Sequence, residues 1–202
     1  MDRTPVAAID QLPPVDEHTD RMDEKVIQRR TRREKSLDVF PDSDSRFRLE
    51  ARLRDTSVAL DDENDIEVIH DLQIEATVSV PDLTILDISA RAHHQPYSEC
   101  SPTAVAVKRL TGLTLKRGYR RDVLAILGGT RGCSHFVTLA LDLSATHILS
   151  TYMRMRDEVE NTPMNRANGT WTRVGLQIEP TLRDACFALR SDSPVYKNVA
   201  EE

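Results

Sequence analysis

The fold is decided by residues 66–80, which read IEVIHDLQIEATVSV. Every second position from Ile66 to Val80 is apolar, except that His70 takes one of these places. This period of two predicts a β-strand with one face in the core, because successive side chains of a strand point to opposite faces. His70 is therefore expected on the core face, either as a hydrogen-bonded structural residue or as a ligand, with Asp71 beside it.

Shorter alternating stretches flank the central one. Residues 47–53 and 86–92 carry an apolar side chain at every second position, and His94 continues the second series on the same side. Pro81 and Asp82 favour a turn between the central stretch and the one that follows. We therefore expect an antiparallel meander of three strands.

Helical spacing of apolar residues follows the third strand. It predicts helices over residues 103–111 and 118–127, and a longer helix from Cys133 to the Asn-Thr-Pro sequence at residues 161–163. The predicted fold class is α+β, a small antiparallel β-meander with helices packed on one face.

The sequence GGTRGCSH, residues 128–135, places a thiol and an imidazole at the start of the long helix. The partial positive charge of a helix N-terminus favours thiolate, which is both the nucleophilic and the metal-binding form of Cys133. A glycine-capped turn with an incidental small hydrophobic residue explains Cys133 equally well. Cys133 and His135 are therefore candidate residues whose role depends on what else lies nearby.

Composition limits the classes of function. The chain has 202 residues and a formal net charge of −6, which suits one domain with extensions and argues against a general nucleic-acid binder. No apolar run approaches the roughly 20 residues that cross a bilayer, and no signal peptide is apparent, so we expect a cytoplasmic protein that binds neither membrane nor nucleic acid. Cys100 and Cys133 should then be reduced and suited to metal or catalytic chemistry, whereas Cys186 is predicted to be a buried hydrophobic residue.

We predict three parts in the chain. Residues 1–45 contain four prolines and dense charge, with too few apolar side chains for a core, and should form a mobile or draped N-terminal arm. Residues 46–160 should form the core domain. Residues 161–202 should be a C-terminal extension with a weak strand at 171–178 and a short helix at 181–190.

A basic run, RRTRR, occupies residues 29–33 near the end of the predicted arm. Such a run is typical of a solvated charged segment. It can also bind the anionic tail of a substrate, or a partner, and the sequence leaves these interpretations open.

The order of motifs along the chain resembles a bacterial family catalogued as domain of unknown function number twenty-eight eighty-nine. The resemblance covers roughly residues 29–155 and rests on His70-Asp71, Tyr97-Ser98-Glu99-Cys100, Leu127-Gly128-Gly129 and Gly132-Cys133-Ser134-His135. The same order is more distantly similar to the iron–sulfur cluster assembly scaffolds, in which three cysteine motifs converge on one metal site.

The similarity to the scaffolds implies a metal site with Asp71, Cys100 and Cys133 as ligands. Ile69 stands where the scaffolds have their first cysteine, so one thiolate is missing. Two thiolates completed by imidazole or carboxylate suit Zn²⁺ better than iron. The predicted metal ligands are Asp71, Cys100, Cys133 and His135.

Two classes of function remain open. The first is an enzyme acting on a small organic molecule, a lyase in preference to a hydrolase, in aromatic or acyl catabolism. No nucleotide cofactor is expected, because the sequence has no nucleotide-binding motif. Its candidate catalytic residues are His70, His94, Tyr97, Glu99, Cys133 and His135. The second is a non-catalytic metal-binding or scaffold-like module; the enzyme is favoured because the polar groups outnumber what a closed four-ligand site needs. A homodimer is left open.

Overall fold

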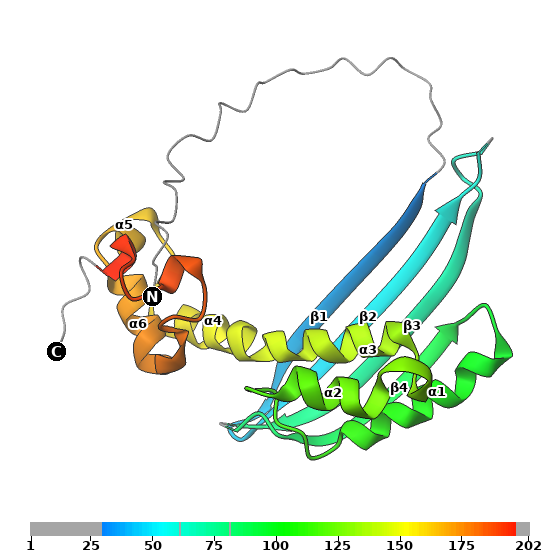
Figure 1. Ribbon diagram of the computed structural model, residues 1–202. Helices are drawn as coiled ribbons and strands as arrows, with labels where there is room; N and C mark the ends of the chain where they lie inside the picture. The colour runs from blue at the N-terminus through cyan, green and yellow to red at the C-terminus, as the bar shows by residue number, and fades with distance from the viewer. Residues whose placement is uncertain (1–29, 61, 81, 197–202) are drawn as a thin grey trace, which may run out of the picture.

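The computed structural model describes residues 30–60, 62–80 and 82–196. Its strands are β1 (Thr31–Ser43), β2 (Arg46–Val58), β3 (Ile66–Ser79) and β4 (Ile85–His94). They form one antiparallel sheet in the order of the sequence (Figure 1). The predicted α+β class and the meander are confirmed, with one strand more than expected.

The additional strand, β1, corrects the last part of the arm predicted for residues 1–45. Residues 31–43 pair with β2, and Leu37 and Val39 pack against the core. The dense charge of this segment suggested an arm, but an edge strand needs only one apolar row, because its other face and its free edge meet water. Residues 1–29 lie outside the described residues.

The hydrophobic core lies between one face of the sheet and a layer of helices (Figure 1). The helices of this layer are α1 (Ser101–Ala106), α2 (Tyr119–Leu127) and α3 (Ser134–Asp142). The largest fully buried side chains come from both layers and include Leu49, Leu53, Ile74, Ile85, Ile88, Leu110, Leu127, Phe136 and Leu139. The prediction that helices cover the face carrying Leu72 and Ile74 is confirmed.

A shift of register between Thr77 and Val78 changes which side chains β4 presents to the core. Ile85 is 1% exposed, whereas Leu86, which the alternation placed on the core face, is 44% exposed. An irregularity of this kind moves the alternation by one position. The core row therefore begins at Ile85 and resumes at Ile88.

The predicted long helix after Cys133 consists of two helices. A 3₁₀ turn at Leu143–Ala145 separates α3 from α4 (Thr146–Glu158). The Ser144 hydroxyl donates a hydrogen bond to the Leu141 carbonyl, and such local bonds compete with the regular helical pattern. Within the described ranges, no helix is long and apolar enough to cross a membrane.

A small C-terminal lobe sits at the far end of α4 and contains α5 (Pro163–Ala167) and α6 (Thr170–Ile178) (Figure 1). The predicted strand at residues 171–178 is wrong, because these residues form α6. Alternation of apolar residues from 174 to 178 suggested a strand. Packing favours the helix instead, since the Trp171 ring stacks on Tyr152 of α4 with the ring centroids 6.3 Å apart.

The predicted helix at residues 181–190 is also wrong. The chain there makes short 3₁₀ turns at Pro180–Leu182 and Phe187–Leu189. Asp184 between them has a φ of 62°, which a right-handed helix does not contain. Cys186 is exposed rather than buried, because no continuous helix turns it toward a core.

Candidate functional site

Three neighbouring strands place three ionisable side chains in one row. Arg33 of β1 is the register partner of Asp55 of β2, and Asp55 is the register partner of His70 of β3. Directly opposed residues of antiparallel strands point to the same face of a sheet. This face is the one that α3 covers, since the His135 side chain of α3 lies against both Asp55 and His70.

The row is held together by hydrogen bonds. Arg33 Nε donates to Asp55 Oδ1 and Arg33 Nη2 donates to Oδ2, each at 2.7 Å. The bound guanidinium holds the pKa of Asp55 below its usual value, although burial acts in the opposite direction. Asp55 Oδ2 also lies 3.0 Å from His70 Nδ1. Because an ionised carboxylate only accepts, Nδ1 of His70 must donate, and in the neutral form of the ring Nε2 is then the nitrogen that can accept a proton.

Sequence reasoning missed Asp55 and Arg33. The apolar series of β2 runs through residues 47–53, and Asp55 is the next position on the same side. A carboxylate that continues a core-facing apolar row is the sequence signal that could have identified Asp55. In the structure Asp55 is 8% exposed. Arg33 belongs to the basic run of the predicted arm, for which the sequence indicates no partner in the sheet.

The start of α3 brings two further groups to the row. Cys133 is the N-cap residue of α3, and His135 lies in its first turn. Cys133 Sγ is 3.3 Å from His135 Nδ1, and His135 Nε2 is 3.7 Å from Asp55 Oδ2. The rings of His135 and His70 lie with centroids 3.9 Å apart. Burial lowers the pKa of His135, the neighbouring His70 and Arg33 lower it further, and the Asp55 carboxylate acts in the opposite direction, so the net effect favours the neutral imidazole.

Two glycines allow α2 to turn closely into α3. A Cβ added to Gly128 would lie 2.4 Å from the Leu124 carbonyl oxygen, and one added to Gly132 would lie 2.8 Å from the Leu127 carbonyl oxygen. Neither distance is compatible with a real side chain, and each contact is to backbone, which cannot rotate away. The glycines therefore fix where Cys133 and His135 enter the site.

A cavity of about 820 Å³ opens beside these groups. Five of the six candidate catalytic residues line it, namely His70, Tyr97, Glu99, Cys133 and His135. Pro96, Thr103 and Cys100 contribute to the same wall, from the segment between β4 and the end of α1. The sixth candidate, His94, is exposed and is not part of this lining.

Residues 31–149 match the model of a family described as Protein of unknown function (DUF2889). The chain belongs to this family. The matched region contains the whole sheet, α1 to α3 and the row of Arg33, Asp55 and His70. No curated protein and no solved structure matches the chain, so the more distant similarity to iron–sulfur scaffolds has no support from these comparisons.

The predicted metal ligands do not converge as one group. Asp71 follows His70 and so points to the opposite face of the sheet, where Arg52 donates two hydrogen bonds to its carboxylate. Cys100 and Cys133 line the same cavity. Among the described residues, the group whose ligand atoms lie within 4.8 Å of one another is Asp55, His70 and His135.

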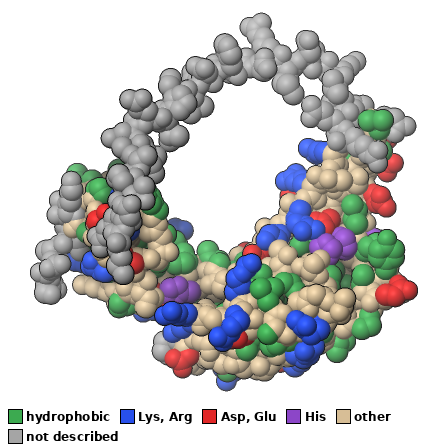
Figure 2. Space-filling model, in the orientation of Figure 1, with side chains coloured by type: hydrophobic (Ala, Val, Ile, Leu, Met, Phe, Trp, Pro, Cys, Tyr) green, Lys and Arg blue, Asp and Glu red, His purple; other side chains and the backbone are tan. Residues whose placement is uncertain are grey.

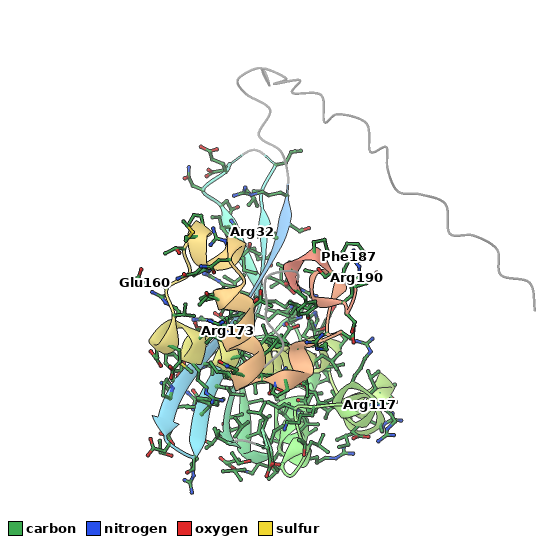
Figure 3. All side chains as sticks on the ribbon, turned by 90° about the vertical axis from the view of Figure 1, so that its left-hand side faces the viewer. Arg32, Arg117, Glu160, Arg173, Phe187 and Arg190 are labelled. Atoms are coloured by element: carbon green, nitrogen blue, oxygen red, sulfur yellow. The ribbon has the colours of Figure 1, made fainter. Side chains whose placement is uncertain are left out.

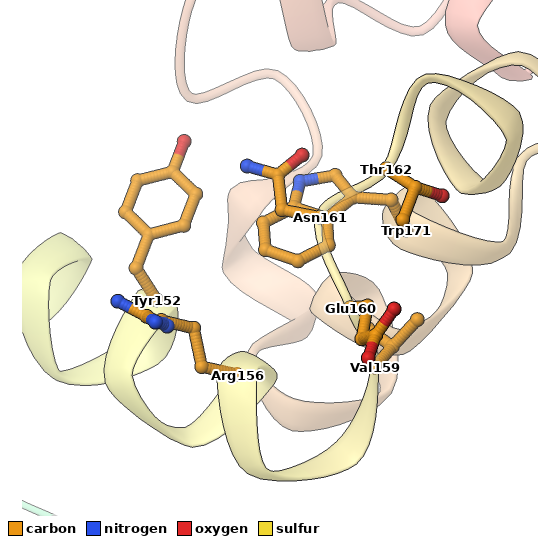
Figure 4. A pocket seen from close by; sticks show the side chains of 7 residues that line it. All are labelled: Tyr152, Arg156, Val159, Glu160, Asn161, Thr162 and Trp171. Atoms are coloured by element: carbon orange, nitrogen blue, oxygen red, sulfur yellow. The ribbon is translucent and has the colours of Figure 1, made fainter.

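A second cavity, of about 680 Å³, lies in the C-terminal lobe, outside the family-matched region (Figure 4). Tyr152, Arg156 and Trp171 line it, together with residues 159–162. Its ionisable lining residues are Tyr152, Arg156 and Glu160, and no histidine or cysteine is among the residues that line it. The cavity beside His70 is therefore the stronger candidate for chemistry.

Proposed function

We propose that this protein is an enzyme that acts on a small organic molecule, as a lyase or a hydrolase, without a nucleotide cofactor. The observation that carries the proposal is the pairing of an oriented imidazole, His70 held by Asp55, with a thiol and imidazole pair, Cys133 and His135. An aromatic or acyl body fits a cavity whose walls include Pro96 and Tyr97.

As a lyase, the enzyme uses His70 as its base. Asp55 accepts from Nδ1 and keeps Nε2 free, which is the arrangement of a general base with an orienting carboxylate. Nε2 removes a proton from a substrate carbon, and the electron pair of that bond forms a double bond. The leaving group departs from the adjacent carbon with its bonding pair and takes the proton back from His70.

As a hydrolase, the enzyme uses Cys133 as its nucleophile. His135, whose lowered pKa favours the neutral imidazole, accepts the thiol proton at Nδ1 across 3.3 Å. The thiolate attacks an acyl carbon, the leaving group departs with the proton from His135, and water then cleaves the thioester. His70 activates that water.

A two-panel assay tests the proposal and separates the two reactions. Purified protein is incubated with 3-hydroxy-3-phenylpropanoate and related β-substituted acids, and separately with p-nitrophenyl acetate, butanoate and benzoate. For a lyase, His70→Gln lowers the rate by about 10²-fold or more, as expected for loss of a general base. For a hydrolase, Cys133→Ala abolishes turnover and an acyl-protein adduct appears in the intact mass of the wild type. Cys186→Ala, an exposed thiol outside the cavity, is the control.

Turnover of both panels at the same rate by wild type and by the His70→Gln/Cys133→Ala double variant would contradict the proposal. So would equal loss of activity in Cys186→Ala.

A second candidate function is metal binding without catalysis. The supporting observation is the group of Asp55, His70 and His135, two imidazoles and a carboxylate, a ligand set that binds Zn²⁺ or Fe²⁺. Arg33 occupies both carboxylate oxygens, so a metal would have to share or displace these bonds.

Calorimetric titration of EDTA-treated protein with ZnCl₂, and anaerobically with Fe²⁺, tests metal binding. One equivalent should bind, His70→Gln should abolish binding, and His94→Gln should not change it, because His94 is an exposed histidine outside the group. Binding that survives His70→Gln would contradict this second candidate.

A further inference from the structure

A smaller hollow, of about 460 Å³, adjoins the 820 Å³ cavity that His70 and Cys133 line. Ile69, His70 and His135 line both spaces. The two imidazoles therefore stand at the junction of two hollows. A molecule lying across this junction would place its middle against the reactive groups and its two ends in different surroundings.

The chemistry of the two hollows differs. The cavity side offers Pro96, Tyr97 and the two cysteines. The adjoining hollow is lined by Thr31 and Thr56, by Arg32 and Arg33, and by Asp55, whose carboxylate Arg33 binds. Figure 2 shows Lys or Arg side chains beside a histidine over the ends of strands β1 to β3. One end of the site thus suits an apolar body and the other suits an anion.

Both arginines keep donors for a ligand. Arg33 uses Nε and Nη2 to bind Asp55, which leaves Nη1 out of these two bonds, and its side chain is 45% exposed. Arg32 pairs with Glu34, but the two side chains are 56% and 53% exposed. A pair this exposed contributes little and is readily exchanged for another anion.

We infer that the substrate of the proposed enzyme is an amphipathic organic carboxylate, with its apolar body in the cavity and its carboxylate in the hollow at Arg32 and Arg33. The inference rests on the proposed function. A single negative charge fits better than a phosphate dianion, because Asp55 and Glu34 already neutralise part of the charge of the two arginines. The planar fork of a guanidinium also matches a carboxylate.

Binding of a ligand series tests the inference without turnover. The probes are ω-phenylalkanoates from phenylacetate to 6-phenylhexanoate, each compared by calorimetry with the alcohol of the same length. At least one acid should bind ten times more tightly than its alcohol, with an optimum at one chain length that spans both hollows. The preference should weaken at high salt.

Variants locate the anion. Arg32→Ala should reduce the preference for the acid by threefold or more. Arg33→Lys should do the same, while it keeps a cation beside Asp55. Arg117→Ala is the control, because Arg117 is an exposed arginine that lies far from Arg32 (Figure 3). Circular dichroism checks that each variant is folded.

Equal binding of acids and alcohols would overturn the inference, as would a preference for acids that neither arginine variant reduces. The activity panels described above report separately on the proposed function. Turnover without any preference for acids would therefore leave the enzyme proposal standing and remove only the carboxylate substrate.

Discussion

Asp55 and His70 face each other across β2 and β3, with Asp55 Oδ2 3.0 Å from His70 Nδ1. Asp71, the next residue after His70, faces the other side of the sheet and is bound by Arg52. The two aspartates thus have similar arginine partners, and only Asp55 also binds a histidine. This difference allows a matched comparison.

Asp55→Asn and Asp71→Asn should have similar effects on stability and different effects on activity. Each variant loses charge-assisted hydrogen bonds to a partly exposed arginine, so each should lower the free energy of unfolding by about 1 to 2 kcal/mol. Asp55→Asn also releases His70 and should lower kcat by about 10²-fold or more. Urea unfolding and steady-state kinetics measure the two effects. A loss of activity in Asp71→Asn as large as in Asp55→Asn would contradict the assignment.

Stability should fall in acid because of these two aspartates. Bound arginines hold the pKa of Asp55 and of Asp71 below the value near 3.9 of an unfolded chain. The stabilisation is therefore present above about pH 4 and is lost as the pH falls through the lowered pKa values. Unfolding in urea at pH 6, 4 and 3 should show a steeper loss in wild type than in Asp55→Asn/Asp71→Asn. Parallel curves would show that other carboxyl groups are responsible.

The pKa of His135 should depend on His70. Burial is the main cause that lowers the pKa of His135, and the neighbouring His70 adds to it. His70→Gln should therefore raise the pKa of His135 toward the usual value. NMR titration of the imidazole Cε1 resonances in EDTA-treated protein measures this shift, with His93→Gln as the control because His93 instead binds Gln73. An unchanged pKa of His135 in His70→Gln would contradict the ring contact.

Gly132→Ala should displace Cys133. The new Cβ would lie 2.8 Å from the Leu127 carbonyl oxygen, and overpacking of this kind costs about 1 to 3 kcal/mol. Gly112→Ala is the control, since a Cβ added there would meet nothing within 4 Å and only the φ of +89° would destabilise the variant, by about 1 to 2 kcal/mol. Both variants should be less stable in thermal unfolding. Only Gly132→Ala should change the alkylation rate of Cys133, and an equal change in Gly112→Ala would refute the steric argument.

The alkylation rate of Cys133 should depend on His135. Cys133 Sγ lies 3.3 Å from His135 Nδ1, which the proposed mechanism uses to accept the thiol proton, so His135→Gln should slow the reaction of Cys133 with iodoacetamide severalfold. Cys100 and Cys186 serve as internal controls in the same peptide map. If alkylation of all three thiols slows by the same factor, the variant has changed the fold or the access of the reagent, and the prediction for the Cys133–His135 pair is wrong.

The sequence predicted the fold correctly where a local pattern of apolar residues specifies the element. Alternation in residues 66–80 predicted the central strand, and the turn at Pro81 and Asp82 predicted antiparallel pairing, which the register confirms. Helices after Cys100 and Cys133 followed from their apolar spacing. Segments 31–43 and 171–178 were predicted wrongly, because a neighbouring strand orders the first and packing against α4 makes the second helical.

The sequence by itself determined which face of the central strand is buried, and hence that His70 points toward the helices, because a strand alternates its side chains. It also determined that Cys133 and His135 begin a helix after a glycine turn. Only the tertiary structure decided that Asp55, and not Asp71, belongs with them. That choice depends on the register between β2 and β3, which pairs Asp55 with His70, 15 residues later in the sequence. Hydrogen bonds across the sheet fix this register, and no local sequence pattern predicts it.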